Sequence, residues 1–143
     1  ARILDKGVNL KKGAKNLLAF LKREGIPIAL ATSSVESRAR IILDSNGILS
    51  LFDHLVFAKD VKRSKPYPDI FLKACSDLNV LPENCLVLED SEAGIAAAYR
   101  AGIPVICIPD LKMPAQSFLN KTEQVFQDLD AVRDYLESRK ENQ

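Results

Sequence analysis

Two acidic residues stand side by side where an apolar run ends. In "CLVLEDSEAG" (85–94), Glu89 and Asp90 directly follow the apolar residues. Neighbouring carboxylates raise each other's pKa unless a cation lies beside them. A hard divalent ion with oxygen ligands, Mg²⁺ above all, removes this conflict. Glu89 and Asp90 are therefore candidate Mg²⁺ ligands, although Asp90 could instead be only a helix N-cap.

Hydroxyl side chains follow a second apolar run. In "ALATSS" (29–34), Thr32, Ser33 and Ser34 stand where a helix is expected to begin. Hydroxyls and backbone N–H groups at a helix N-terminus bind anions, and phosphate is a common one. The alternative is simple capping, because Ser and Thr are favoured at this position in any case.

A lysine in a stiffened loop is the third candidate. In "RSKPYPDIF" (63–71), Lys65 is followed by Pro66 and Pro68, which restrict the backbone before a helix. A lysine held in this way suits a place against phosphate or carboxylate oxygens. The alternative is a solvated surface lysine. An anion pocket, a fixed cation and a metal-binding acid pair are together the parts that phosphoryl transfer requires.

Short apolar runs alternate with amphipathic stretches along the whole chain. We expect strands over 26–31, 55–58, 85–89, 104–108 and 125–126, and helices over 13–25, 34–47, 69–79, 92–102 and 128–138. Continuously apolar strands are typical of a parallel sheet buried on both faces. The alternation predicts an α/β fold with a doubly wound parallel sheet. Ligands of such sheets bind at the carboxyl ends of the strands, where the three candidate groups are expected to meet.

The composition excludes several classes of partner. Of the 143 residues 47% are hydrophobic, and the net charge of +1 gives no overall attraction to nucleic acid or to an anionic membrane. No apolar run has the length of a membrane span. The three cysteines, Cys75, Cys85 and Cys107, have no CxxC spacing, which argues against a zinc site or a disulfide framework. They indicate a reducing compartment, and we expect the cytoplasm.

The order of "ALATSS", "KPYPDIF" and "LVLEDSEAG" resembles the second, third and fourth motifs of the haloacid dehalogenase-like (HAD) phosphohydrolases. The resemblance is to the branch with β-phosphoglucomutase and sugar-phosphate phosphatases, and it extends through "GIPVICIPD" (102–110). It implies a Rossmann-like core, Mg²⁺ as cofactor and a small phosphorylated metabolite as partner.

The resemblance also implies a role for each candidate residue. Thr32 would hydrogen-bond the transferred phosphoryl group, and Lys65 would bridge that group and the nucleophile. Asp90 would bind Mg²⁺, with Glu89 as a further ligand or a partner of the ligands. Ser33 and Ser34 would line the phosphate pocket.

The family's first motif, an aspartate nucleophile with a second acid two residues later, has no match. Asp5 in "RILDKGVNL" (2–10) is followed by Gly7 at that place and preceded by almost no strand, so we reject it. Residues 1–12 are interpreted as the return from a cap domain, and 13–143 as the carboxyl-terminal part of the core. The first strand, the nucleophile and the cap would then lie on a missing N-terminal segment. This predicts an incomplete sheet with two unpaired inner edges, between the strands that end at Thr32 and at Glu89.

The predicted function is that of an Mg²⁺-dependent phosphatase of small phosphate esters, sugar phosphates above all, acting through an upstream aspartate. Residues 1–143 alone would be inactive. A mutase is one alternative, but mutases of this branch carry Lys-Asn after the serine that matches Ser34. Val35 and Glu36 stand there instead, and the Glu36 charge would repel a second phosphate. A non-catalytic module that binds phosphate and Mg²⁺ is the other alternative.

Overall fold

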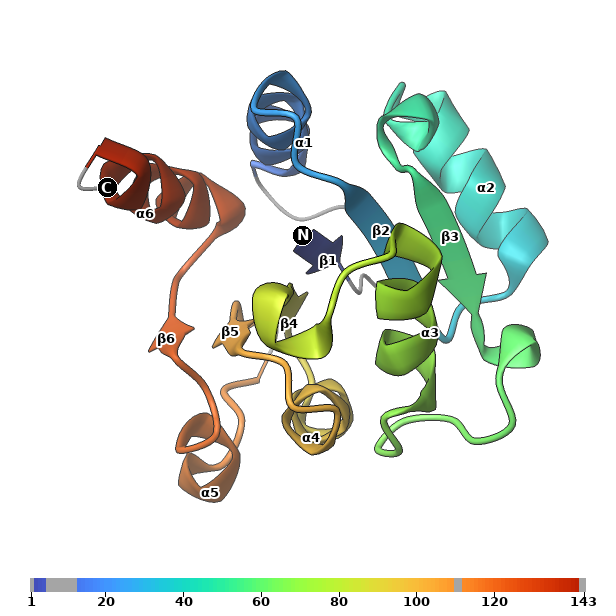
Figure 1. The fold of residues 1–143 in the computed structure, drawn as a ribbon, viewed down its shortest axis with the longest axis vertical. Coiled ribbons are helices and arrows are strands. Elements are labelled where there is room, and N and C mark those ends of the chain that lie inside the picture. Colours follow the sequence, from blue (N-terminus) through green and yellow to red (C-terminus); the bar gives the residue numbers. More distant parts are fainter. Residues whose placement is uncertain (1, 5–12, 110–111, 142–143) are drawn as a thin grey trace.

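Six parallel strands form the sheet at the centre of the computed structural model, which describes residues 2–4, 13–109 and 112–141 (Figure 1). Their order across the sheet is β3-β2-β1-β4-β5-β6. The strands are β1 (Arg2–Leu4), β2 (Ile28–Thr32), β3 (His54–Phe57), β4 (Leu86–Glu89), β5 (Val105–Cys107) and β6 (Gln124–Val125). The helices are α1 (Ala14–Arg23), α2 (Glu36–Ser45), α3 (Asp69–Leu78), α4 (Glu92–Arg100), α5 (Gln116–Leu119) and α6 (Leu129–Glu141). Short 3₁₀ turns cover Leu49–Leu51, Ala58–Asp60 and Pro82–Asn84.

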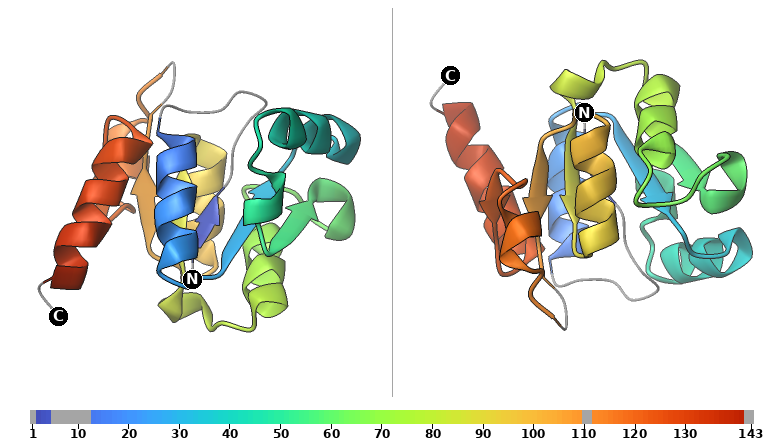
Figure 2. Two further views of the ribbon diagram at one scale, coloured as in Figure 1. Left: turned by 90° about the horizontal axis from the view of Figure 1, so that it is seen from above. Right: turned by 90° about the horizontal axis from the view of Figure 1, so that it is seen from below.

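The two faces of the sheet bury different side chains because successive residues of a strand point to opposite sides. In β2, Ile28 and Leu30 pack in one core with side chains of α1, α2 and α6. Ala29 and Ala31 pack in the other core with α3 and α4. Figure 2 shows α1 and α4 on opposite sides of the strands. The sheet is therefore covered on both faces, and the predicted doubly wound parallel α/β class is confirmed.

Glycines end three of the predicted helices. Gly25, Gly47 and Gly102 follow α1, α2 and α4 with φ angles of 71°, 71° and 75°. Only glycine adopts this left-handed conformation without strain, which explains why the helices stop there. Ser34, where the helix over 34–47 was expected to begin, does not cap α2: Val35 occupies the N-cap position, and no side chain caps the helix.

A three-residue strand at the centre of the sheet corrects one prediction. We expected the place between β2 and β4 to be empty, but β1 pairs with both of them, with Ile3 opposite Ala29 and Val87. Two inner edges without partners would leave rows of N–H and C=O groups unsatisfied, so a strand in this place is strongly favoured. The first strand of the sheet is thus supplied by 2–4, within the stretch interpreted as a return from a cap. Asp5 and the rest of 5–12 lie outside the described residues.

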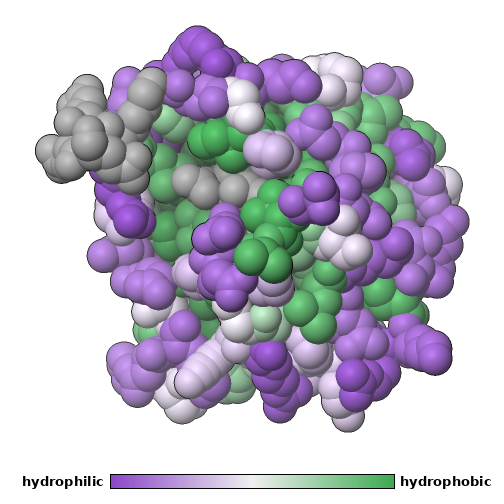
Figure 3. All heavy atoms as spheres, viewed as in Figure 1, coloured by the Kyte–Doolittle hydropathy of each residue, from purple (hydrophilic) through white to green (hydrophobic). Residues whose placement is uncertain are grey.

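The other expected elements are present, with ends shifted by three residues at most. Helix α5, only four residues long, was not predicted. Among the described helices, none combines the length and the hydrophobicity that a membrane crossing needs. Figure 3 shows hydrophobic side chains in the middle of one face, bordered by hydrophilic ones.

Candidate functional site

The predicted site residues meet at the carboxyl edge of the sheet. Thr32 ends β2, Glu89 ends β4, and Lys65 comes from the loop between β3 and α3. A cavity of about 540 Å³ lies there. Its lining includes all six predicted residues, Thr32, Ser33, Ser34, Lys65, Glu89 and Asp90. It also includes Ala58, Ser64, Ser91 and Ala93, which the sequence did not single out.

An ion pair joins two of these side chains deep in the cavity wall. Lys65 Nζ donates to Glu89 Oε2 at 3.2 Å and more weakly to the Ala31 carbonyl at 3.5 Å. The Lys65 and Glu89 side chains are only 7% and 1% exposed. Lys65 is therefore not the solvated surface lysine of the alternative interpretation.

Packing fixes the direction of Lys65. Its Nζ lies 4.9 Å from the centre of the Phe71 ring of α3, and the carbonyl of Pro66 accepts a hydrogen bond from Arg100 of α4. Burial lowers the pKa of Lys65, and the charges of Glu89 and Asp90 oppose this shift. A buried ammonium group is costly unless a negative charge lies beside it. The site thus holds a lysine whose charge depends on the carboxylates around it.

Both oxygens of Glu89 already have partners. Oε2 accepts from Lys65, and Oε1 accepts from the backbone N–H groups of Asp90 and Ser91 at 3.0 and 3.2 Å and from the Ser91 hydroxyl at 3.1 Å. A Cβ atom added to Gly94 would lie 2.0 Å from Cδ of Glu89. The glycine in "EDSEAG" therefore makes room for this carboxylate, which acts here as an acceptor for Lys65 and the backbone.

Ser91 caps helix α4. Its hydroxyl accepts a hydrogen bond from the Gly94 N–H at 3.0 Å while it donates to Glu89. The alternative interpretation of Asp90 as the N-cap is thus wrong. Sequence reasoning missed Ser91, although Ser followed by an acidic first turn is a common helix start.

Thr32 turns the chain at the end of β2. Its hydroxyl oxygen accepts from the Ser34 N–H at 3.1 Å, and the residue is 1% exposed. Neither Thr32 nor the two serines caps α2. The capping alternative is therefore not what the structure contains, and the three residues line the cavity instead.

The donors around the cavity suit a hard cation with few protein ligands. Mg²⁺ usually keeps several waters and takes one or two carboxylates plus substrate phosphate oxygens. Asp90 and Glu89 both line the cavity, and the Glu89 carboxylate accepts hydrogen bonds from Lys65, Ser91 and the backbone. In the described part of the chain, no three His, Cys, Asp or Glu side chains gather into a metal cage.

The charge of Glu36 is compensated by two basic side chains. Its carboxylate contacts Lys59 Nζ at 2.5 Å and Arg40 Nε at 2.7 Å. The hydrogen bond from Lys59, and then that from Arg40, hold the pKa of Glu36 below its ordinary value. This neutralisation weakens the argument that Glu36 repels a second phosphate of the substrate.

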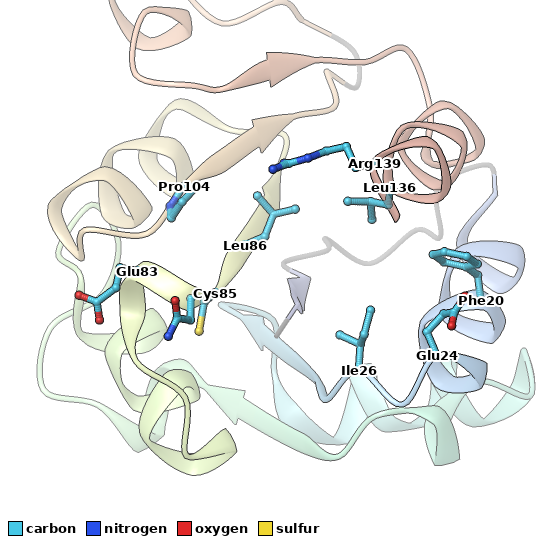
Figure 4. Close-up of a pocket in the computed structure, with 10 residues that line it drawn as sticks. Phe20, Glu24, Ile26, Glu83, Cys85, Leu86, Pro104, Leu136 and Arg139 are labelled. Carbon is cyan, nitrogen blue, oxygen red and sulfur yellow. The ribbon is translucent and has the colours of Figure 1, made fainter. Parts of the chain in front are cut away.

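A second cavity, of about 490 Å³, lies at the opposite, amino edge of the sheet (Figure 4). Ile26, Leu86 and Leu136 give it an apolar wall, and Arg139 of α6 contributes a charged group. No sequence pattern indicated this cavity, because its lining comes from the starts of three strands and from two helices distant in the chain.

Fold and site define a doubly wound α/β protein with a buried lysine–carboxylate pair at its ligand-binding edge. Residues 1–108 match the family described as haloacid dehalogenase-like hydrolases. The chain belongs to this family, and the resemblance found in its motifs is confirmed.

Known proteins of the family are similar over much of the chain. Validoxylamine A 7'-phosphate phosphatase of Streptomyces hygroscopicus subsp. limoneus is 39% identical over 85% of this chain and 56% of its own length. β-Phosphoglucomutase of Bacillus subtilis is 42% identical over 66% of this chain and 41% of its own. The crystal structure of CbbY from Rhodobacter sphaeroides in complex with phosphate has a TM-score of 0.76 and 30% identity, covering 83% of this chain and 54% of CbbY. The chain thus spans about half the length of these relatives.

Proposed function

We propose that this chain is part of an Mg²⁺-dependent phosphohydrolase that acts on small phosphate esters, above all those of sugars. The observation that carries the proposal is the buried Lys65–Glu89 pair, 3.2 Å apart, in one cavity with Thr32 and Asp90. The names of the similar proteins support it, since one is a phosphatase of a 7'-phosphate and another is a phosphoglucomutase. CbbY, with the same fold, binds phosphate.

Each residue has a distinct task in this proposal. A carboxylate oxygen of the nucleophilic aspartate attacks phosphorus, the bond from phosphorus to the ester oxygen breaks, and the alcohol takes up a proton as it leaves. Water then hydrolyses the aspartyl-phosphate. Lys65 donates to a phosphoryl oxygen and to the nucleophile, while Glu89 keeps the Lys65 ammonium group charged. Thr32 donates to another phosphoryl oxygen, and Ser33 and Ser34 line the pocket.

Asp90 would hold the magnesium ion at the carboxyl edge. When bound, Mg²⁺ supplies neutralisation of the charge on the phosphoryl oxygens. In this proposal Glu89 positions Asp90 and is not itself a metal ligand. The N–H group of Asp90 donates to Glu89 Oε1 at 3.0 Å, and this hydrogen bond orients the peptide that carries the Asp90 carboxylate.

The nucleophile, in this proposal, is an aspartate upstream of Ala1, on a strand that brings the cap with it. Such a strand would have to take the central place that Arg2–Leu4 takes in this structure. The presence of β1 removes one reason for rejecting Asp5, namely the missing strand before it. The other reason remains, because Gly7 stands where the family has its second acid.

A mutase and a non-catalytic binding module are the competing functions. The pairing of Glu36 with Lys59 and Arg40 makes the mutase a stronger competitor than the sequence indicated. The proposal includes a reducing compartment such as the cytoplasm, because the three buried cysteines are not disulfide-bonded in the structure.

Phosphate release from a panel of sugar phosphates, measured with the natural-length protein and Mg²⁺, tests the proposal. We expect hydrolysis of at least one ester, and a loss on the order of 100-fold for Asp90→Asn, because even indirect partners of a metal contribute 10–100-fold. Asp5→Asn should leave the rate unchanged if the nucleophile lies upstream, and its inactivation would contradict that part. Interconversion of glucose 1- and 6-phosphates without phosphate release would favour the mutase. Phosphate binding without turnover would favour the binding module.

A further inference from the structure

Two of the three cysteines lie in direct contact. Cys75, near the end of α3, donates a hydrogen bond from its thiol to Cys85 Sγ at 3.1 Å. Cys85 directly precedes β4, and the two residues are 2% and 4% exposed. A disulfide has a sulfur–sulfur distance of about 2.05 Å, so the two sulfurs would have to approach by only about 1 Å.

The amino-edge cavity gives small molecules a route to this pair. Cys85 lines the cavity, between Asn84 and Leu86, and Figure 4 shows it on the wall beside Leu86. Cys75 is not among the residues that line the cavity, and its thiol contacts Cys85 Sγ. Oxidation would therefore begin at Cys85, the cysteine of the pair that lines the cavity, and Cys75 is in position to complete a bond.

We propose that Cys75 and Cys85 form a reversible disulfide, a redox modification site that is separate from the phosphate site. The oxidant is a small peroxide that enters the amino-edge cavity, and the reductant is a dithiol. The proposal rests on the contact between the sulfurs and on the cavity, and it does not depend on the proposed function.

Two balanced steps give the disulfide. The Cys85 thiolate attacks one peroxide oxygen, the O–O bond breaks, and the other oxygen leaves as water after taking up a proton. The Cys75 sulfur then attacks Cys85 Sγ, the S–O bond of the sulfenic acid breaks, and hydroxide leaves as water with the proton of Cys75. Overall, two thiols and one hydrogen peroxide give one disulfide and two waters. A dithiol reverses the change by thiol–disulfide exchange.

The surroundings of Cys75 set the rate of the second step. Burial, and then its hydrogen bond to Cys85, raise the pKa of the Cys75 thiol to about 12. Because the thiolate is the attacking form, closure of the bond is slow at neutral pH and accelerates as the pH rises.

The disulfide would connect α3 to the start of β4. The other ends of the same two segments lie near Lys65 and Glu89, since α3 begins at Asp69 and β4 ends at Glu89. The closed loop constrains the unfolded chain, so oxidation should raise the melting temperature.

The test is peptide mapping of the purified protein after hydrogen peroxide treatment, with differential alkylation before and after reduction. We expect Cys75 and Cys85 to lose alkylation together, in one cross-linked peptide that a dithiol releases, and the rate of loss to rise between pH 7 and pH 9. Alkylation is carried out after denaturation because all three cysteines are buried, and Cys107 of β5 is the internal control that should remain fully alkylated without reduction.

Variants make the test sharper. Cys75→Ala should leave Cys85 as a sulfenic acid that a dimedone reagent traps, whereas Cys107→Ala should form the cross-link like the wild type. Alkylation of both thiols after prolonged peroxide treatment would overturn the proposal. So would a disulfide that involves Cys107 or a second molecule. The mapping of the wild type gives this answer even if a variant fails to fold.

Discussion

Two buried pairs connect the segment 65–78 with the segment 85–89, and they differ in chemistry. At the carboxyl edge of the sheet Lys65 meets Glu89 at 3.2 Å, and at the amino edge Cys75 meets Cys85 at 3.1 Å. Both pairs are nearly hidden from water. A buried charge depends strongly on its partner, whereas a buried neutral thiol is a small apolar side chain that tolerates replacement.

The comparison shows how the groups at the two edges of the sheet differ. The charged pair lies in a cavity with hydroxyls and a further carboxylate, so an anion or a cation that enters meets groups already ordered by hydrogen bonds. The thiol pair adjoins a cavity whose lining combines apolar side chains with Glu24, Glu83 and Arg139, and the link between the two thiols is a single hydrogen bond.

The largest expected effect on stability comes from removing the negative charge of the Lys65–Glu89 pair. Glu89→Gln keeps an acceptor for Ser91 and the backbone but withdraws the negative charge beside Lys65. We expect the free energy of unfolding to fall by about 3 kcal/mol, because breaking a buried ion pair leaves a costly charge. Urea denaturation measures this.

The matched comparison uses the double variants. Lys65→Met combined with Glu89→Gln should be clearly less destabilised than the sum of the single changes. Cys75→Ala with Cys85→Ala should show a smaller coupling, on the order of 0.5–1 kcal/mol, because the two thiols are in contact but neither is held by a charge. If coupling between the thiols equals or exceeds that between the charges, the contrast between the two pairs is wrong.

A smaller effect is expected from crowding the charged pair. In Gly94→Ala the new Cβ would overlap the carboxylate of Glu89, with Cδ at 2.0 Å. Overpacking of this kind costs about 2 kcal/mol, and it should also weaken phosphate binding, since the carboxylate must move away from Lys65. Isothermal titration with inorganic phosphate and thermal unfolding report the two effects.

Gly25→Ala is the control for this change. Gly25 has a positive φ, but nothing lies within 4 Å of its added Cβ. It should cost only about 1 kcal/mol, from backbone strain, and leave phosphate binding intact. Equal losses of phosphate binding in both variants would show that the clash at Glu89 is not the cause.

The smallest effect is a pH dependence that arises from the thiol pair. The pKa of Cys75 is raised from its usual 9.0 to about 12, so above pH 9 the unfolded chain loses this proton while the folded chain keeps it. Under reducing conditions, stability should therefore decrease between pH 8 and pH 10, by about 1 kcal/mol from this group. Below pH 8 the Cys75 thiol is protonated in both the folded and the unfolded chain, so it contributes no pH dependence to the free energy of unfolding.

Cys75→Ala isolates this contribution from other groups that titrate in alkali. Its stability should fall less steeply than that of the wild type between pH 8 and pH 10, as measured by urea denaturation at each pH. Parallel curves for the two proteins would show that burial of the Cys75 thiol does not resist ionisation.

Local pattern predicted most of the fold and the composition of the site. Thr32, Lys65, Glu89 and Asp90 each follow or adjoin a strand end, and parallel strands bring such ends to one edge. The strand Arg2–Leu4 was missed because three residues are too few to display a period. The contact of Cys75 with Cys85 depends on how α3 lies on the sheet, which no local pattern records.

The hydrogen-bond partners of Glu89 were also beyond sequence reasoning. The family resemblance implied Asp90 as the Mg²⁺ ligand and Glu89 as a further ligand or a partner of the ligands, but no local pattern shows that Glu89 accepts from Lys65 and the backbone. The glycine in the first turn of α4 was a hint, since Gly94 is the residue that leaves space for Glu89.

The short central strand β1 divides the sheet into two groups of strands. On one side of β1 lie β2 and β3, against which α3 packs, and on the other lie β4, β5 and β6. The Lys65–Glu89 ion pair and the Cys75–Cys85 contact both connect these two groups of strands across β1, the first at the carboxyl edge of the sheet and the second at the amino edge. A charged ligand at the carboxyl edge and oxidation at the amino edge would thus both change the contacts that hold β2 and β3 against β4, β5 and β6.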